Sequence, residues 1–210
     1  MRKEEQDADR SSFLINGNKL LEDLIAASDG KSNPIRNYSA DELIKATNNF
    51  DASCIMQECR IYKMFRGVLD GRSIIIKKFL TLTWLNEDAV RSLAIRDIVI
   101  STQMSNHNNV LKLLGCCLEF PIPALVHEYA TVGVLNDQGG FGANGYLTWK
   151  ARLGIAKQLA NTLTYLHTAF PRPIILRDLN PILRDLNPSC IYLGHDYLIM
   201  FPNSHTSRSP

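Results

Sequence analysis

Apolar and polar positions follow two kinds of pattern along the chain, and each kind predicts a different element. Apolar residues recur at helical spacing in three stretches, 13–27, 84–103 and 148–167. Shorter apolar runs bounded by turn residues, which are typical of strands, occupy 55–79, 110–118 and 124–129. Residues 131–146 are rich in Gly and are predicted to form a loop. The order predicts an α+β chain with five strands and a helix, then a linker, then a second, helical part.

The first part of the chain carries less pattern. Residues 1–12 are charged and polar and are predicted to be disordered. Asn16-Gly17 interrupts the apolar spacing that follows, so the first helix is predicted to begin at about Asn18. A short helix is predicted next, with Ser39 as its N-cap and Glu42 completing a capping box. The predicted boundaries are a tail and helix over 1–37, a strand-rich part over 38–130, and a helical part over 131–210.

Composition narrows the classes of function without naming one. Hydrophobic residues make up 45% and charged residues 21% of 210 residues, which is enough apolar material for a buried core. A net charge of +2 gives no reason to expect nucleic acid as a partner. No apolar run approaches the roughly 18 residues that span a bilayer, and no secretory segment is expected. The five Cys lack regular spacing, so Cys116 and Cys117 are predicted to be buried thiols in a reducing cytosol.

One five-residue motif occurs twice, as Leu176-Arg177-Asp178-Leu179-Asn180 and again at 183–187. It is similar to the catalytic loop H-R-D-L-K-P-x-N of protein kinases, in which the Asp is the base and the Asn holds Mg²⁺. Both copies carry Leu for His and Asn for Lys. Leu183 and Cys190 stand where the metal-binding Asn is required, which leaves Asp178 and Asp185 as catalytic remnants.

Longer segments carry a family resemblance over most of the chain. They are 38–50, the Asn-His segment 106–119, the hinge-like Leu125-Val126-His127-Glu128-Tyr129, and 163–167. Together they resemble plant receptor-like kinases of the wall-associated-kinase-like branch, and most closely the ZRK family of cytoplasmic pseudokinases. The resemblance implies a protein-kinase-like fold with a complete N-lobe, a five-stranded antiparallel sheet plus helix αC, and only the first part of a helical C-lobe.

The same resemblance assigns positions in the nucleotide site. Aligned with the kinase glycine-rich loop, Gln57, Cys59 and Tyr62 replace the three glycines. Lys77 matches the strand lysine that pairs the phosphates, and Asp97 is its candidate helix partner, one residue off the usual spacing. Glu128 and Tyr129 fall at the hinge. No nucleotide, metal or other cofactor is therefore expected.

Two further motifs argue against catalysis. Counting past the second loop copy places Asn203-Ser204-His205 where D-F-G belongs, so the second metal ligand is also missing. Gly140-Phe141-Gly142-Ala143-Asn144-Gly145 satisfies G-x-G-x-x-G but lies past the hinge. It is interpreted as a surface loop, because a dinucleotide or kinase site needs a strand immediately before it and a helix or returning strand after it.

Three functions remain open at this stage. The resemblance implies an inactive adaptor or decoy in plant immunity that is cytoplasmic, with any plasma-membrane association made through partners. Those partners are the leucine-rich-repeat region of an NLR receptor and receptor-like cytoplasmic kinases targeted by pathogen effectors. The helix over 13–25 is predicted either to pack back on its own first lobe or to contact these partners. Both hold if Leu14, Leu20 and Leu24 face outward to the partners and Leu21 and Ile25 face inward. The alternatives are a weak ATP-binding serine/threonine kinase and a truncated duplicate without stable function.

Overall fold

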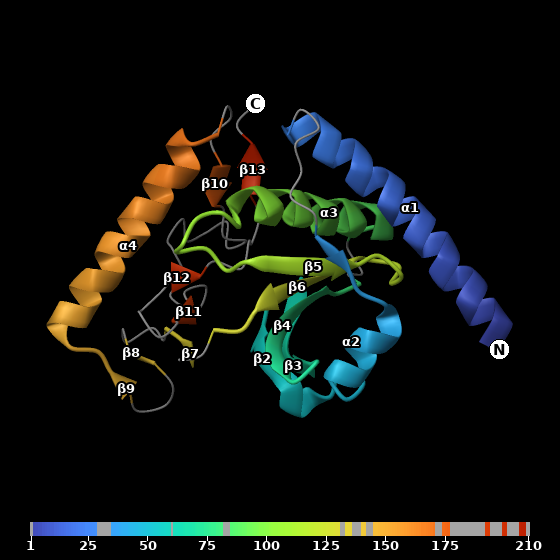
Figure 1. The fold of residues 1–210 in the computed structure, drawn as a ribbon, viewed down its shortest axis with the longest axis horizontal. Helices are drawn as coiled ribbons and strands as arrows, with labels where there is room; N and C mark the ends of the chain where they lie inside the picture. The colour runs from blue at the N-terminus through green and yellow to red at the C-terminus, as the bar shows by residue number, and fades with distance from the viewer. Residues whose placement is uncertain are drawn as a thin grey trace. The chain divides into compact units, whose positions relative to one another are not determined.

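The computed structural model describes two units within the chain. The described residues are 2–28, 35–59, 61–81, 85–130, 133–135, 140–141, 145–170, 174–176, 192–193, 199–200 and 206–208. Unit 1 comprises Met1–Gln103 with Leu113–Tyr129, and unit 2 comprises Met104–Lys112 with Ala130–Pro210. Figure 1 shows the helices and strands of both units.

Unit 1 is built on a six-stranded sheet with the order β1-β5-β6-β4-β3-β2. Its strands are β1 (Arg36–Asn37), β2 (Ile55–Glu58), β3 (Tyr62–Leu69), β4 (Arg72–Phe79), β5 (Leu113–Cys117) and β6 (Ala124–Glu128). The five strands β2 to β6 pair antiparallel, as predicted. The two-residue strand β1 adds a parallel sixth strand beside β5, where the backbone approaches so closely that only Gly115 fits.

Local sequence explains the main hairpin. Asp70 and Gly71 join β3 to β4 with positive φ angles of 50° and 72°, the conformation that a two-residue β-hairpin turn requires. Along β4, side chains alternate between the faces of the sheet. Ile74 and Ile76 enter the core cluster that contains Leu43 of α2 (Ala40–Ala46). Lys77 lies on the opposite face and bonds to α3 (Glu87–Met104).

The predicted cap of α2 is observed, whereas the predicted first residue of α3 is not. Ser39 and Glu42 form the predicted capping box of α2. The Asn86 side chain accepts a hydrogen bond from the Ala89 amide at 2.8 Å, so α3 begins later than the predicted start at 84. The short 3₁₀ helix η1 (Ala52–Cys54) then leads into β2.

The N-terminal helix differs from the prediction. α1 runs continuously from Arg2 to Ser28, through residues predicted to be disordered and through Asn16-Gly17. Asn16 does not interrupt the helix because its side chain is fully buried and bonds to the rest of unit 1. The prediction of a helix start at about Asn18 was therefore wrong.

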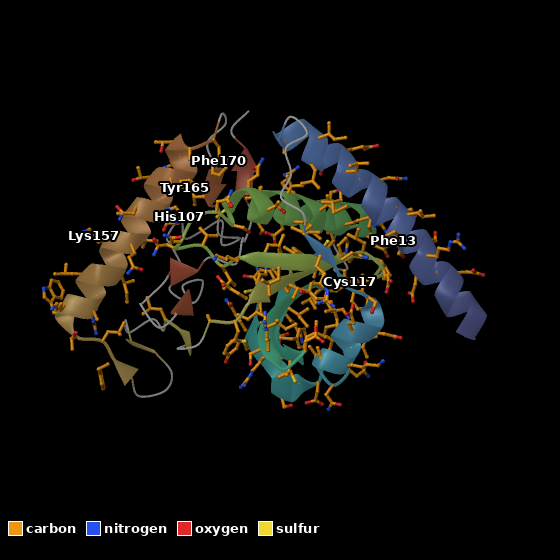
Figure 2. The ribbon with its side chains drawn as sticks, viewed as in Figure 1. Phe13, His107, Cys117, Lys157, Tyr165 and Phe170 are labelled. Carbon is orange, nitrogen blue, oxygen red and sulfur yellow. The ribbon has the colours of Figure 1, made fainter. Side chains whose placement is uncertain are left out.

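Unit 2 is described mainly through α4 (Trp149–Thr168), which begins at the N-cap Thr148. The ring centroids of His107 and Tyr165 lie 4.5 Å apart, and Phe170 packs edge-on against Tyr165 (Figure 2). β8 (Gly140–Phe141) and β9 (Gly145–Tyr146) form a two-stranded antiparallel sheet from the ends of the glycine-rich motif, in place of the predicted loop. The remaining described strands are β7 (Gly133–Val134), β10 (Ile174–Leu176), β11 (Tyr192–Leu193), β12 (Ile199–Met200) and β13 (Thr206–Arg208).

Candidate functional site: an enclosed lysine and an exposed helix face

The three positions predicted to replace the kinase glycines lie in the β2–β3 hairpin. Gln57 lies on β2, and its Nε2 donates to Cys59 Sγ at 3.6 Å. The Cys59 amide donates to the Tyr62 carbonyl at 2.9 Å, which closes the turn into β3. Tyr62 is only 1% exposed, so its side chain is directed into unit 1 and not toward solvent.

Lys77 and Asp97 form a buried ion pair between β4 and α3. Lys77 Nζ lies 2.7 Å from Asp97 Oδ2, and the two side chains are 0% and 6% exposed. The pairing that the sequence left in question is therefore made, even though Asp is one methylene shorter than Glu. Such a pair is costly to break on one side, because the remaining charge is then buried without its counterion.

Aromatic side chains enclose the same ammonium group. Lys77 Nζ lies 4.2 Å from the centroid of the Tyr62 ring and 5.2 Å from that of Phe79. The two rings contact each other in a T-shaped arrangement, with their centroids 6.2 Å apart. Both distances from Nζ fall within the range of a cation–π interaction, which strengthens when water is excluded. Tyr62 therefore lies against Lys77 from a position predicted to align with a kinase glycine.

This enclosure does not fit a nucleotide phosphate. A phosphate oxygen would have to approach Nζ to about 2.8 Å to make a charge-assisted hydrogen bond. Asp97 and the two rings surround that atom, and the Lys77 side chain has no exposed surface. Lys77 thus serves in the described structure as the cation of an internal pair.

The hinge residues lie at the end of β6, on the same sheet. Glu128 pairs with Ile74 in the β4–β6 register and is half-buried. The Arg66 guanidinium of β3 lies 5.3 Å from the centroid of the Tyr129 ring. The positions of Glu128 and Tyr129 at the end of β6 follow from the predicted strand. The strand pairing of Glu128 with Ile74 and the contact of Tyr129 with Arg66 were not predicted.

The predicted catalytic remnants lie outside the described residues. These are Asp178 and Asp185, together with Leu183, Cys190 and Asn203, which were predicted to stand in place of metal ligands. Among the residues that the structure does describe, no group of three or more His, Cys, Asp or Glu could hold a metal ion.

Cys116 and Cys117 are buried, as predicted. Burial, reinforced by the neighbouring thiol, raises the pKa of Cys116 to about 12. Burial likewise raises the pKa of Cys117, to about 11. Both groups are therefore protonated near neutral pH and lack the thiolate that metal binding or nucleophilic attack requires.

α1 is fastened to unit 1 along one side. The buried Asn16 amide donates to the carbonyls of Leu118 and Phe120 at 2.8 and 2.9 Å. Nearer the end of the helix, Gln103 Nε2 donates to the Ala27 carbonyl at 2.9 Å. The position of Asn16 four residues before the apolar Leu20 was the available sequence signal for a buried anchor, but its pairing with Gly17 was interpreted as a break.

The exposed side of α1 differs from the predicted one. Leu20 is 7% exposed and Leu24 is half-buried, whereas Leu21 and Ile25 are 58% and 56% exposed. Leu14 is 56% exposed, as expected of a residue available to a partner. The inward and outward assignments of the predicted set were therefore wrong for Leu20, Leu21 and Ile25. Leu14, Leu21 and Ile25 are spaced by seven and four residues and form one stripe, here termed the α1 face.

Comparison with known proteins places this geometry in a family. The family model for protein tyrosine and serine/threonine kinase matches residues 59–181, more than half of the chain. The chain belongs to the protein kinase family. The predicted resemblance to ZRK proteins is confirmed by relatives from Arabidopsis thaliana. The serine/threonine-protein kinase ZRK1 is 47% identical over 86% of this chain and 52% of its own length. The non-functional pseudokinase ZED1 is 49% identical over 80% of this chain and 49% of its own length.

Solved structures confirm the predicted kinase-like fold. The pseudokinase DRIK1 (drought responsive inactive kinase 1), bound to ENMD-2076, superposes with a TM-score of 0.61. It is 24% identical and is matched over 80% of this chain and 62% of its own. An apo pseudokinase gives a TM-score of 0.62 at 24% identity, over 82% of this chain and 60% of its own. This chain spans about half the length of the curated relatives it matches.

Proposed function

We propose that the chain is a catalytically inactive pseudokinase that acts as an adaptor or decoy in plant immune signalling. Its partners would be an NLR receptor, bound through the leucine-rich-repeat region, and cytoplasmic kinases that pathogen effectors target. Among its relatives, ZED1 and ZRK2 are named non-functional pseudokinases. The observation that carries the inactive part is the enclosure of Lys77, since phosphoryl transfer requires that lysine to reach the nucleotide.

The adaptor part is supported by the α1 face. Leu14, Leu21 and Ile25 are each more than half exposed on a helix that is anchored from its other side by Asn16. An apolar stripe on a fixed helix is a typical surface for binding another protein, because its burial costs little ordering of the helix itself. Asn18 is also exposed near this stripe and supplies a polar rim.

The experiment is co-precipitation of the full chain with an NLR receptor of the same plant. Leu21→Asp combined with Ile25→Asp should reduce capture by at least about tenfold, because each buried leucine-sized side chain contributes about 1.5–3 kcal/mol. Val68→Asp is the matched control, since Val68 is 54% exposed on β3 of the same unit. Undiminished capture by a folded double variant would refute the role of the α1 face.

A weak ATP-binding kinase is the second candidate, favoured by one observation. The intact Lys77–Asp97 pair corresponds to a contact that active kinases require between strand and helix. Thermal-shift titration with ATP and Mg²⁺ separates the two functions. A saturable rise in Tm with ATP and Mg²⁺ would support the enzyme, and no rise at millimolar ATP supports the pseudokinase.

A further inference from the structure

The α1 face belongs to a longer regular pattern on the outer side of its helix. Ser11, Leu14, Asn18, Leu21 and Ile25 are spaced by three, four, three and four residues, and all five side chains are exposed. This is the spacing of the a and d positions of a coiled coil, and residues so spaced lie along one line of the helix. Leu14 and Leu21 occupy d positions, whereas Ser11, Asn18 and Ile25 occupy a positions.

The residue types on this line favour a second copy of the chain as the occupant. Leu at d with Ile at a favours a two-stranded parallel pair, and a single Asn at an a position fixes the register of that pair. In a parallel, in-register pair of α1 helices, each Asn18 amide meets its own counterpart and each leucine meets a leucine. An antiparallel pair would set Asn18 against Leu14 or Leu21 and leave a buried amide without a hydrogen-bond partner.

The anchoring of α1 to unit 1 leaves this line accessible. Asn16, whose amide donates to the carbonyls of Leu118 and Phe120, lies on the opposite side of the helix from the α1 face. The two copies of unit 1 would therefore lie on the outer sides of the helix pair. Because unit 1 already holds each helix in its folded form, pairing costs little ordering, and a contact of only three apolar layers becomes sufficient for a weak dimer.

We propose that two copies of the chain pair in parallel through their α1 faces, and that this pairing competes with the NLR receptor for the same surface. The competition rests on the adaptor function proposed above, whereas the pairing does not. A bilayer surface fits less well, because the helix is acidic over residues 7–27, with Asp7, Asp9, Glu22 and Asp23 against Arg10 and Lys19. Self-association would cover the apolar residues of the α1 face until a partner displaces the second copy.

Sedimentation equilibrium of the full chain tests the pairing at about 1–300 μM, the range in which weak interfaces dissociate. A monomer–dimer equilibrium is expected. Leu21→Asp should abolish the dimer, because it buries two carboxylates against each other. Asn18→Leu should tighten the dimer by about tenfold, since an Asn at an a position fixes register at a cost in stability. Val68→Asp, at an exposed position of β3, is the control and should change nothing.

The outcomes of this experiment decide the proposal. A monomer at every concentration, or a dimer that Leu21→Asp preserves, would overturn it. Far-UV circular dichroism of each variant as a monomer should match the parent, so that loss of the dimer is not loss of the fold. A chain that stays monomeric but binds phosphatidylserine vesicles would assign the α1 face to membranes, which also overturns the pairing.

Cross-linking tests the parallel register. Under oxidation, Ser11→Cys should form a reducible dimer with itself, because in-register a positions face each other. Ser12→Cys is the matched control, since Ser12 is half-buried on the other side of the helix. It should cross-link no faster than the parent, whose own five Cys set the background. Equal rates for Ser11→Cys and Ser12→Cys would contradict a parallel pair.

Capture on an immobilised NLR receptor separates the pairing from the adaptor function. With the receptor in excess, the captured fraction of the chain should fall as its concentration rises through the dissociation constant of the dimer. A dimerising chain whose captured fraction is constant across that range would overturn the competition. No capture at any concentration, by a chain that still dimerises, would refute the adaptor function while supporting the pairing.

Discussion

The buried Lys77–Asp97 pair provides the sharpest test of the described structure. Lys77→Met leaves the Asp97 carboxylate 6% exposed and without the ammonium group 2.7 Å away. Removing one partner of a buried pair costs about 3–5 kcal/mol, and a cation–π contact with a desolvated ring adds about 2 kcal/mol. Domain stability is only about 5–15 kcal/mol, so this single change should remove a large part of it.

Replacing both partners should cost far less than replacing one. Lys77→Met combined with Asp97→Leu fills the same space with apolar side chains and leaves no buried charge. The double variant should lie within about 2 kcal/mol of the parent, because buried pairs often contribute no more than their apolar substitutes. The double-mutant cycle should therefore show a coupling of several kcal/mol between the two sites.

The assay is urea unfolding at 15 °C followed by circular dichroism, with each variant compared at a constant m-value. Lys63→Met is the matched control, since it breaks the partly exposed pair with Glu58 at 2.9 Å and should cost less than about 1 kcal/mol. Single substitutions at Lys77 and Asp97 that cost as little as this control would refute the reasoning. They would mean that both charged groups reach water, and the enclosure by Tyr62 would then be wrong.

Four further predictions follow from particular contacts. Tyr62→Ala should destabilise the chain by about 3–5 kcal/mol and make Tm respond to ADP, because it opens the space beside Lys77; an unresponsive folded variant would contradict the enclosure. Asn16→Ala should cost about 2–4 kcal/mol and speed amide exchange in α1, whereas Asn18→Ala should do neither. Gly115→Ala should lower Tm, since its Cβ would lie 2.0 Å from the Arg36 carbonyl, while Gly17→Ala meets nothing and should raise Tm. The hydrogen bond from the Ser39 amide lowers the pKa of Glu42. The contribution of the Glu42 carboxylate to the free energy of unfolding should therefore be complete above about pH 5 and be lost on acidification below about pH 4. Glu42→Gln should remove this pH dependence.

Much of the secondary structure of unit 1 could be predicted, because short motifs within its strands and helices determine where they begin and end. The Asp70-Gly71 turn fixed the β3–β4 hairpin, and the Ser39–Glu42 box fixed α2. The full length of helix α1 was not predicted. The reason is that the buried Asn16 side chain is held by hydrogen bonds to carbonyls more than 100 residues away in the sequence. A propensity argument assigns Asn next to Gly to a break, and tertiary hydrogen bonds overrode it.

For the candidate site too, the positions of residues could be predicted from the sequence, but the contacts of their side chains could not. A motif alignment could place Tyr62 at a glycine position, because that depends on sequence order alone. It could not show that the ring turns inward onto Lys77, because this depends on the rotamer that β3, β4 and α3 jointly allow. The wrong assignment of Leu20, Leu21 and Ile25 has a related cause, since an apolar spacing on α1 indicates a stripe but not which edge of it docks.

One turn connects the two parts of the site within unit 1. The segment 118–121 between β5 and β6 accepts the hydrogen bonds of Asn16 from α1, and its Pro121 carbonyl accepts one from Arg91 Nε of α3 at 3.0 Å. Helix α3 also carries Asp97, the counterion of Lys77. The α1 face and the enclosed lysine are thus tied to the same framework through short polar contacts. Under the adaptor function proposed above, a partner that binds α1 would meet a helix whose position depends on the integrity of the kinase-like sheet, and this would be a physical reason for such an adaptor to keep a kinase fold.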